Sequence, residues 1–205
     1  MRVIVSEFLT LDGVMQAPGG ADEDRSEGFE HGGWQGPYFD DAGGKAIFEG
    51  MAASDGFLLG RKTYEIFAAF WPSAPADDPL TETINSLPKY VVSKSLKEPL
   101  EWNNSHLIKG DVAEGIAQLK AQPGKDLQVI GSGDLVQTLM QHDLVDEYRL
   151  MVHPVVLGSG RRLFRDGSAT TPLRLVDTKT TSTGVLILTY QPSGNAADTS
   201  ATTGQ

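Results

Sequence analysis

Three short motifs combine glycine or serine with basic or polar residues, and residues of these types at this spacing could bind anions. They are Gly60-Arg61-Lys62-Thr63, Ser93-Lys94-Ser95 and Gly131-Ser132-Gly133-Asp134. Glycine lets the backbone come close to an anion, and a helix that begins there offers unpaired N–H groups and the positive end of its dipole. Arginine and lysine add the positive charge that phosphate groups need. Each motif alone is common, but their recurrence predicts a site for a phosphate-rich ligand.

Two familiar phosphate-binding motifs are excluded. A P-loop needs glycine where Asp55 stands, and Arg61 separates Gly60 from Lys62. The fingerprint of dinucleotide-binding Rossmann enzymes fails because Val136 occupies the place of its third glycine. A further basic glycine turn, residues 158–162, could hold an anion or could simply be solvated.

The composition restricts the partners of the protein. The 205 residues carry a formal net charge of -10, which disfavours attraction to nucleic acid or to an anionic membrane surface. There is no cysteine, so disulfides, thiolate nucleophiles and zinc–cysteine sites are excluded, and a reducing, cytoplasmic setting is favoured. Hydrolase and zinc-protease motifs are missing, so we expect no metal. No apolar run reaches the roughly 20 residues that span a bilayer, so we expect neither a signal peptide nor a membrane helix.

These motifs follow predicted strands, and most precede predicted helices. Short apolar, β-branched runs predict strands at residues 3–9, 55–59, 89–93, 106–108 and 127–130. Apolar periodicity and turn residues predict helices at residues 37–54, 61–70, 80–86, 112–121 and 135–142. The pattern then changes to extended segments at residues 145–156, 173–181 and 185–190. We therefore expect an α/β fold with a mixed, mostly parallel sheet, antiparallel C-terminal strands and flanking helices.

The domain boundaries follow from the same pattern. We expect one domain over residues 1–192, and a disordered tail over residues 193–205, where small and polar residues dominate. A glycine-rich stretch from Gly13 to Gly36 is too long for a passive connector in a compact domain. We interpret it as a mobile lid or binding loop, with a tolerated surface insertion as the alternative.

Taken together, the motifs resemble the dihydrofolate reductase fold. They resemble more closely the reductase domain of the bacterial bifunctional riboflavin-biosynthesis deaminase-reductase and its stand-alone relatives. The resemblance runs over residues 2–191. It rests on the opening strand with the T-L-D-G-V that follows it, and on the blocks at residues 58–65, 91–95, 129–133, 153–160 and 163–164. The resemblance implies a three-layer α/β fold, NADPH as cofactor, and a homodimer formed through the C-terminal strands.

The resemblance also assigns cofactor-binding residues. Gly60, Arg61, Lys62 and Thr63 fall where the family holds the pyrophosphate, and Ser93, Lys94 and Ser95 fall where it meets the adenosine 2′-phosphate. Gly131, Ser132, Gly133, Asp134 and Leu135 fall along the pyrophosphate and nicotinamide, and Val14 falls beside the nicotinamide. A loop that closes over the nicotinamide would explain the glycine-rich segment.

The substrate side departs from the family pattern. Asp40 and Asp41 do not align with the acidic residue that anchors the pterin in dihydrofolate reductases, so folate reduction is disfavoured. No deaminase zinc motif precedes the domain, so a phosphosugar substrate cannot be assumed. The candidates for substrate contact or catalysis are Asp12, Trp34, Tyr38 and Asp41.

The leading hypothesis is an NADPH-dependent oxidoreductase that transfers a hydride to a C=N or C=O bond of a small substrate, one that could resemble a pterin or a flavin precursor. An alternative is a nucleotide-binding protein without turnover, acting as a sensor or scaffold. A third reading is a dimeric structural domain whose basic turns are only solvated.

Overall fold

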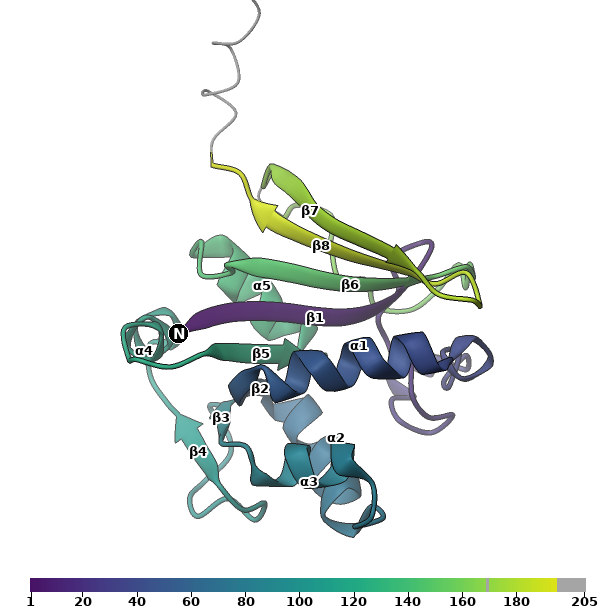
Figure 1. Ribbon diagram of the computed structural model, residues 1–205. Helices are drawn as coiled ribbons and strands as arrows, with labels where there is room; N and C mark the ends of the chain where they lie inside the picture. The colour runs from purple at the N-terminus through teal and green to yellow at the C-terminus, as the bar shows by residue number, and fades with distance from the viewer. Residues whose placement is uncertain (169, 195–205) are drawn as a thin grey trace, which may run out of the picture.

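The computed structural model describes residues 1–168 and 170–194, and an eight-stranded sheet forms its centre (Figure 1). The strands lie in the order β4-β3-β2-β5-β1-β6-β8-β7. Their bounds are β1 Arg2–Thr10, β2 Ser54–Gly60, β3 Lys89–Val92, β4 Ser105–Ile108, β5 Asp126–Ile130, β6 Glu147–His153, β7 Leu173–Thr180 and β8 Leu186–Pro192. The predicted α/β class is confirmed, because the sheet is parallel from β4 to β6, and β8 and β7 are antiparallel to their neighbours.

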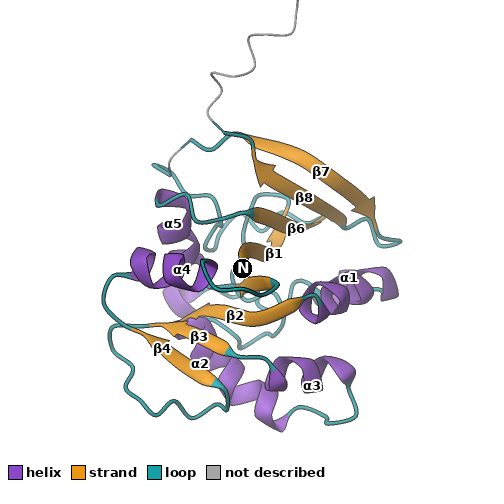
Figure 2. Ribbon diagram, turned by 60° about the vertical axis from the view of Figure 1, so that its left-hand side comes forward, coloured by secondary structure: helices purple, strands orange, loops and turns teal. Residues whose placement is uncertain are grey.

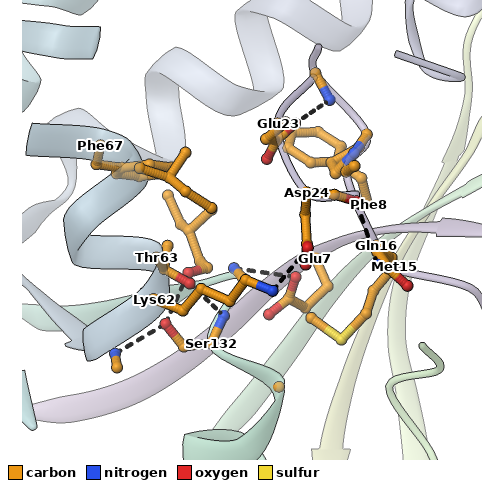
Figure 3. Close-up of a pocket in the computed structure, with 18 of the residues that line it drawn as sticks. Glu7, Phe8, Met15, Gln16, Glu23, Asp24, Lys62, Thr63, Phe67 and Ser132 are labelled. Carbon is orange, nitrogen blue, oxygen red and sulfur yellow. Dashed lines mark hydrogen bonds and ion pairs between the residues drawn. The ribbon is translucent and has the colours of Figure 1, made fainter. Parts of the chain in front are cut away.

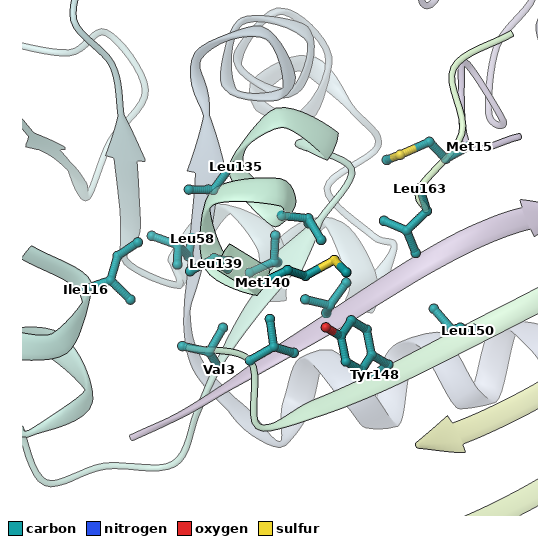
Figure 4. Packing of buried hydrophobic residues seen from close by; sticks show 14 of the residues in the cluster. Val3, Met15, Leu58, Ile116, Leu135, Leu139, Met140, Tyr148, Leu150 and Leu163 are labelled. Atoms are coloured by element: carbon teal, nitrogen blue, oxygen red, sulfur yellow. The ribbon is translucent and has the colours of Figure 1, made fainter. Parts of the chain in front are cut away.

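Five α-helices cover the two faces of the sheet (Figure 2). They are α1 Asp41–Ala52, α2 Arg61–Phe70, α3 Pro79–Ser86, α4 Val112–Lys120 and α5 Gly133–Gln141, with 3-10 turns at Ser26–Gly28, Gly36–Tyr38 and Trp71–Ser73. Apolar residues of α4 and α5 pack on one face, where Leu139 and Tyr148 are buried (Figure 4). The other face packs against α1, α2 and α3 around Phe57 and Ile84. Burial of this apolar surface is the main force that holds the three layers together.

Two helix starts differ from the sequence-based expectation. The helix expected at residues 37–54 begins only at Asp41, because the Asp40 side chain caps it, with Oδ1 accepting the Gly43 N–H at 2.8 Å. The other oxygen of Asp40 accepts from the Ser182 N–H at 2.9 Å and from its hydroxyl at 2.7 Å. The helix expected at residues 135–142 begins earlier, at Gly133, because Ser132 turns the chain with φ 59°.

The long segment after β1 has a small core of its own. Val14, Ala17, Phe29 and Trp34 are buried together against Phe8. The absence of a long helix or strand here agrees with the expected loop, but buried aromatic residues fix it against the sheet. Most of the predicted tail, residues 195–205, lies outside the described residues. Within the described ranges, none of the helices combines the length and the apolar character that crossing a bilayer requires.

Candidate active site

A cavity of about 680 Å³ opens at the carboxyl ends of β1, β2 and β5 (Figure 3). In an open α/β sheet this edge is where ligands usually bind. Most of the predicted cofactor residues line it, namely Gly60, Arg61, Lys62, Thr63, Gly131, Ser132, Gly133, Asp134 and Leu135. Two of the three anion motifs therefore meet at one place, as the parallel strand order requires.

The starts of α2 and α5 are locked to each other at the cavity. The Gly60 N–H donates to Ser132 Oγ at 3.0 Å, and the Ser132 N–H donates to Thr63 Oγ1 at 2.9 Å. Gly131 has φ +60°, and a Cβ there would lie 3.1 Å from Thr63 Oγ1, so the turn suits glycine. Neither helix has a side-chain cap within the described chain, which leaves their first N–H groups available to an anion.

Lys62 is not free in this arrangement, because a carboxylate of the long loop binds it. Asp24 lies 2.7 Å from Lys62 Nζ and 2.6 Å from Arg161 Nη2, and Ser26 Oγ also accepts from Lys62 at 2.9 Å. Burial opposes the ionised form of Asp24, but hydrogen bonds from Lys62 and Ser26 and the charge of Arg161 outweigh it and lower its pKa. The loop thus places a negative charge in the cavity where the basic residues could hold an anion.

The remaining predicted cofactor residues lie outside the lining of this cavity. Lys94 is exposed at the end of β3, and Ser93 Oγ accepts the N–H groups of Ser95 and Leu96 in a local turn. Since β3 lies beside β2, this turn continues the same edge of the sheet. Val14 is fully buried and forms a bridge with Arg162. Their role in cofactor binding stays a prediction.

The substrate-side candidates do not line the cavity, and two of them, Asp12 and Trp34, form hydrogen bonds that hold the loop. Burial opposes ionisation of Asp12, but hydrogen bonds from Thr10 and from the N–H groups of Gly158 and Leu157 lower its pKa to about 2. Trp34 is buried and donates from Nε1 to the Gln16 carbonyl at 2.8 Å.

The other two candidates lie at or just before the start of α1. The Tyr38 carbonyl accepts from Thr183 Oγ1 at 2.7 Å. Asp41 is exposed at the first position of α1.

Glu7 is a cavity residue that sequence reasoning missed. Its side chain is 4% exposed, and its Oε2 accepts the Gly131 N–H at 3.1 Å. Burial raises the pKa of this carboxyl well above 4.5, although the Gly131 N–H acts in the opposite direction. A single acidic residue within an apolar strand was the available signal, because an ionisable group is buried there only with a partner or in its neutral form.

A second cavity of about 250 Å³ adjoins the first beneath α1. The two share Glu7, Phe8, Ile47, Met51 and Ile130 as lining residues. The smaller cavity adds polar side chains from the sheet, including Ser6, Gln128 and Arg149. A long ligand in the first cavity and a small one in the second would thus meet near Glu7.

This arrangement of sheet, helices and cavity is the dihydrofolate reductase-like α/β fold. A putative riboflavin biosynthesis protein from Shewanella sp. PV-4 superimposes with a TM-score of 0.67 at 24% identity, covering 94% of this chain and 99% of that one. A pyrimidine reductase-like protein from Corynebacterium diphtheriae gives a TM-score of 0.65 at 13% identity, covering 93% and 91%. The predicted fold is therefore confirmed.

The chain belongs to the RibD C-terminal domain family, whose model matches residues 1–187. Among curated proteins, the uncharacterized protein YyaP of Bacillus subtilis strain 168 is 37% identical over 145 residues, which cover 68% of this chain and 75% of YyaP. The uncharacterized protein YwjB of the same strain is 34% identical over 127 residues, covering 61% and 67%. The resemblance seen in the sequence motifs is confirmed at the level of the family.

Proposed function

We propose that the protein is an NADPH-dependent reductase of a C=N or C=O bond in a small substrate. The observation that carries this proposal is the large cavity where the uncapped starts of α2 and α5 meet Lys62 and Arg161. Membership of the RibD C-terminal domain family and the pyrimidine reductase-like structural neighbour support an enzyme of the reductase type.

The residues of the cavity fit a phosphorylated dinucleotide. The N–H groups at the starts of α2 and α5, together with Lys62, would hold the pyrophosphate. Lys94, further along the same sheet edge, would meet a 2′-phosphate. Phe8, Met15 and Leu135 would exclude water from the nicotinamide end. When bound, the reduced nicotinamide supplies a hydride, and the protein orients the cofactor and the substrate and excludes water from them.

A nucleotide-binding protein without turnover is the second candidate. The observation that favours it is the Asp24 contact, because an entering phosphate must compete with the loop for Lys62 and Arg161. Binding would therefore move the loop, which is the kind of change that a sensor could transmit to another protein.

One pair of measurements separates the two candidates. Tryptophan fluorescence, with Trp71 in the cavity wall, is followed while NADPH or NADH is added. NADPH absorbance is then followed with dihydrofolate, a ribosylaminopyrimidine and an aromatic aldehyde. We expect NADPH to bind and at least one compound to be reduced. Absence of binding would exclude the reductase and a sensor of these two cofactors, and binding with no reduction of the panel would favour the sensor.

A further inference from the structure

The buried carboxyl group of Glu7 has a hydrogen-bond partner among the described residues for only one of its two oxygens. Oε2 accepts from Gly131, while Oε1 is buried and has no hydrogen-bond partner among the described residues. The residue comes from the middle of the sheet and lines both cavities. Figure 3 shows it between the loop that carries Asp24 and the turn that carries Ser132.

Apart from Glu27, which is exposed on the loop, the other charged groups around the cavity have partners. Lys62 and Arg161 bind Asp24, Arg165 binds Asp134, Arg61 binds Glu65, and Glu23 accepts from the Gly19 and Gly20 N–H groups. None of the ion pairs found within the described residues involves Glu7. A buried carboxyl without a cation favours its protonated form, and its raised pKa agrees.

A protonated Glu7 needs an acceptor for its O–H group. Oε2 is occupied as an acceptor, so the proton belongs on Oε1, where the described protein offers no acceptor. A buried donor without a partner is unfavourable, and a bound ligand with a carbonyl oxygen or ring nitrogen would relieve this. The same carboxyl lies where the two cavities meet, next to the expected reaction centre.

We propose that Glu7 is a catalytic residue that gives the proton to the nitrogen or oxygen of the bond being reduced. This inference rests on the reductase function proposed above. The hydride brings two electrons to carbon, the π electrons of the C=N or C=O bond pass to the heteroatom, and that atom takes the proton as the Oε1–H bond breaks. Glu7 remains as a carboxylate bound by the Gly131 N–H until solvent returns a proton. The substrate must therefore present a neutral acceptor at the reacting bond.

The Glu7→Gln variant tests this role directly. Glutamine keeps the size and the oxygen that accepts from Gly131, but its amide has no acidic proton to transfer. With the panel compound that the wild-type protein reduces, we expect kcat to fall about 100-fold or more, the usual range for loss of a general acid. The Kd for NADPH should stay nearly unchanged. Glu101→Gln, an exposed position before β4, is the matched control and should leave both values unchanged.

Infrared spectroscopy of the protein without any ligand gives a second readout. The wild-type protein at neutral pH should show the carbonyl band of a protonated carboxylic acid, and Glu7→Gln should lack it. Absence of this band from the wild-type protein, or full kcat in Glu7→Gln, would overturn the proton-donor role while leaving the reductase function intact. A wild-type protein that binds NADPH and reduces no panel compound would instead contradict the reductase function, and this step with it.

Discussion

Lys94 stands apart from the main cavity, and under the proposed function it would favour NADPH over NADH. It is exposed at the end of β3, on the same sheet edge as the start of α2. We expect Lys94→Ala to weaken NADPH about tenfold and NADH little, because a charge-assisted hydrogen bond to the 2′-phosphate is worth about 1.5–3 kcal/mol. Titration of both cofactors measures this, with Lys97→Ala as an exposed control. Equal losses for NADPH and NADH would reject the 2′-phosphate contact.

Glu7 should make the free energy of unfolding depend on pH. In the folded protein its pKa is raised well above 4.5, the ordinary value, which we take for the unfolded chain. At a pH between the unfolded and the folded pKa, the folded chain keeps a proton that the unfolded chain has lost. The free energy of unfolding should therefore fall as the pH rises through this window. Urea denaturation at a series of pH values should show a flatter profile for Glu7→Gln than for the wild-type protein. Parallel profiles would mean that Glu7 ionises normally.

The contact between the long loop and α2 makes a prediction at the scale of elements. Asp24→Asn removes the negative charge that neutralises Lys62 and Arg161, so both cations become available to a phosphate. We expect NADPH to bind about tenfold more tightly, and isothermal titration calorimetry measures the change.

Asp22→Asn is the matched control for this contact. It changes the same charge in the same loop, where Asp22 pairs only with the exposed Arg25 among the ion pairs of the described chain. Its affinity for NADPH should equal that of the wild-type protein. Unchanged binding by Asp24→Asn would show that the loop contact does not compete with the cofactor, and weaker binding would show that the contact assists it.

Local sequence patterns were sufficient to predict most elements and the place of the cavity. Alternating strands and helices with glycine turns place Gly60 and Gly131 at the same sheet edge, because parallel strands bring their carboxyl ends together. The pairing of Asp24 with Lys62 could not be predicted, since it depends on how an irregular loop folds over residues far along the chain. The helix start at Asp41 was missed because Asp40 competes as a cap, which apolar periodicity does not reveal.

At the scale of the whole molecule, the open edge of the sheet indicates how two copies could associate. β7 is the last strand of the sheet, and Leu175 and Val176 on it are 49% and 45% exposed. Exposed apolar edge strands favour pairing with another chain. We propose a homodimer through β7 and β8, and expect Leu175→Lys to shift the protein toward the monomer in sedimentation experiments. Leu11→Lys, at a loop residue 66% exposed, is the control. A wild-type monomer would contradict the proposal.

Two contacts of Asp40 link this open edge of the sheet to the cavity. One carboxylate oxygen caps α1, whose Ile47 and Met51 form part of the cavity wall, and the other holds Ser182 at the turn between β7 and β8. The hairpin of β7 and β8 therefore helps to hold α1 in place at the cavity. A shortened chain without this hairpin would lose the contact between Asp40 and Ser182. A second subunit on the hairpin would lie against the element that Asp40 connects to α1, so we expect dimer formation to change the affinity for a ligand in the cavity.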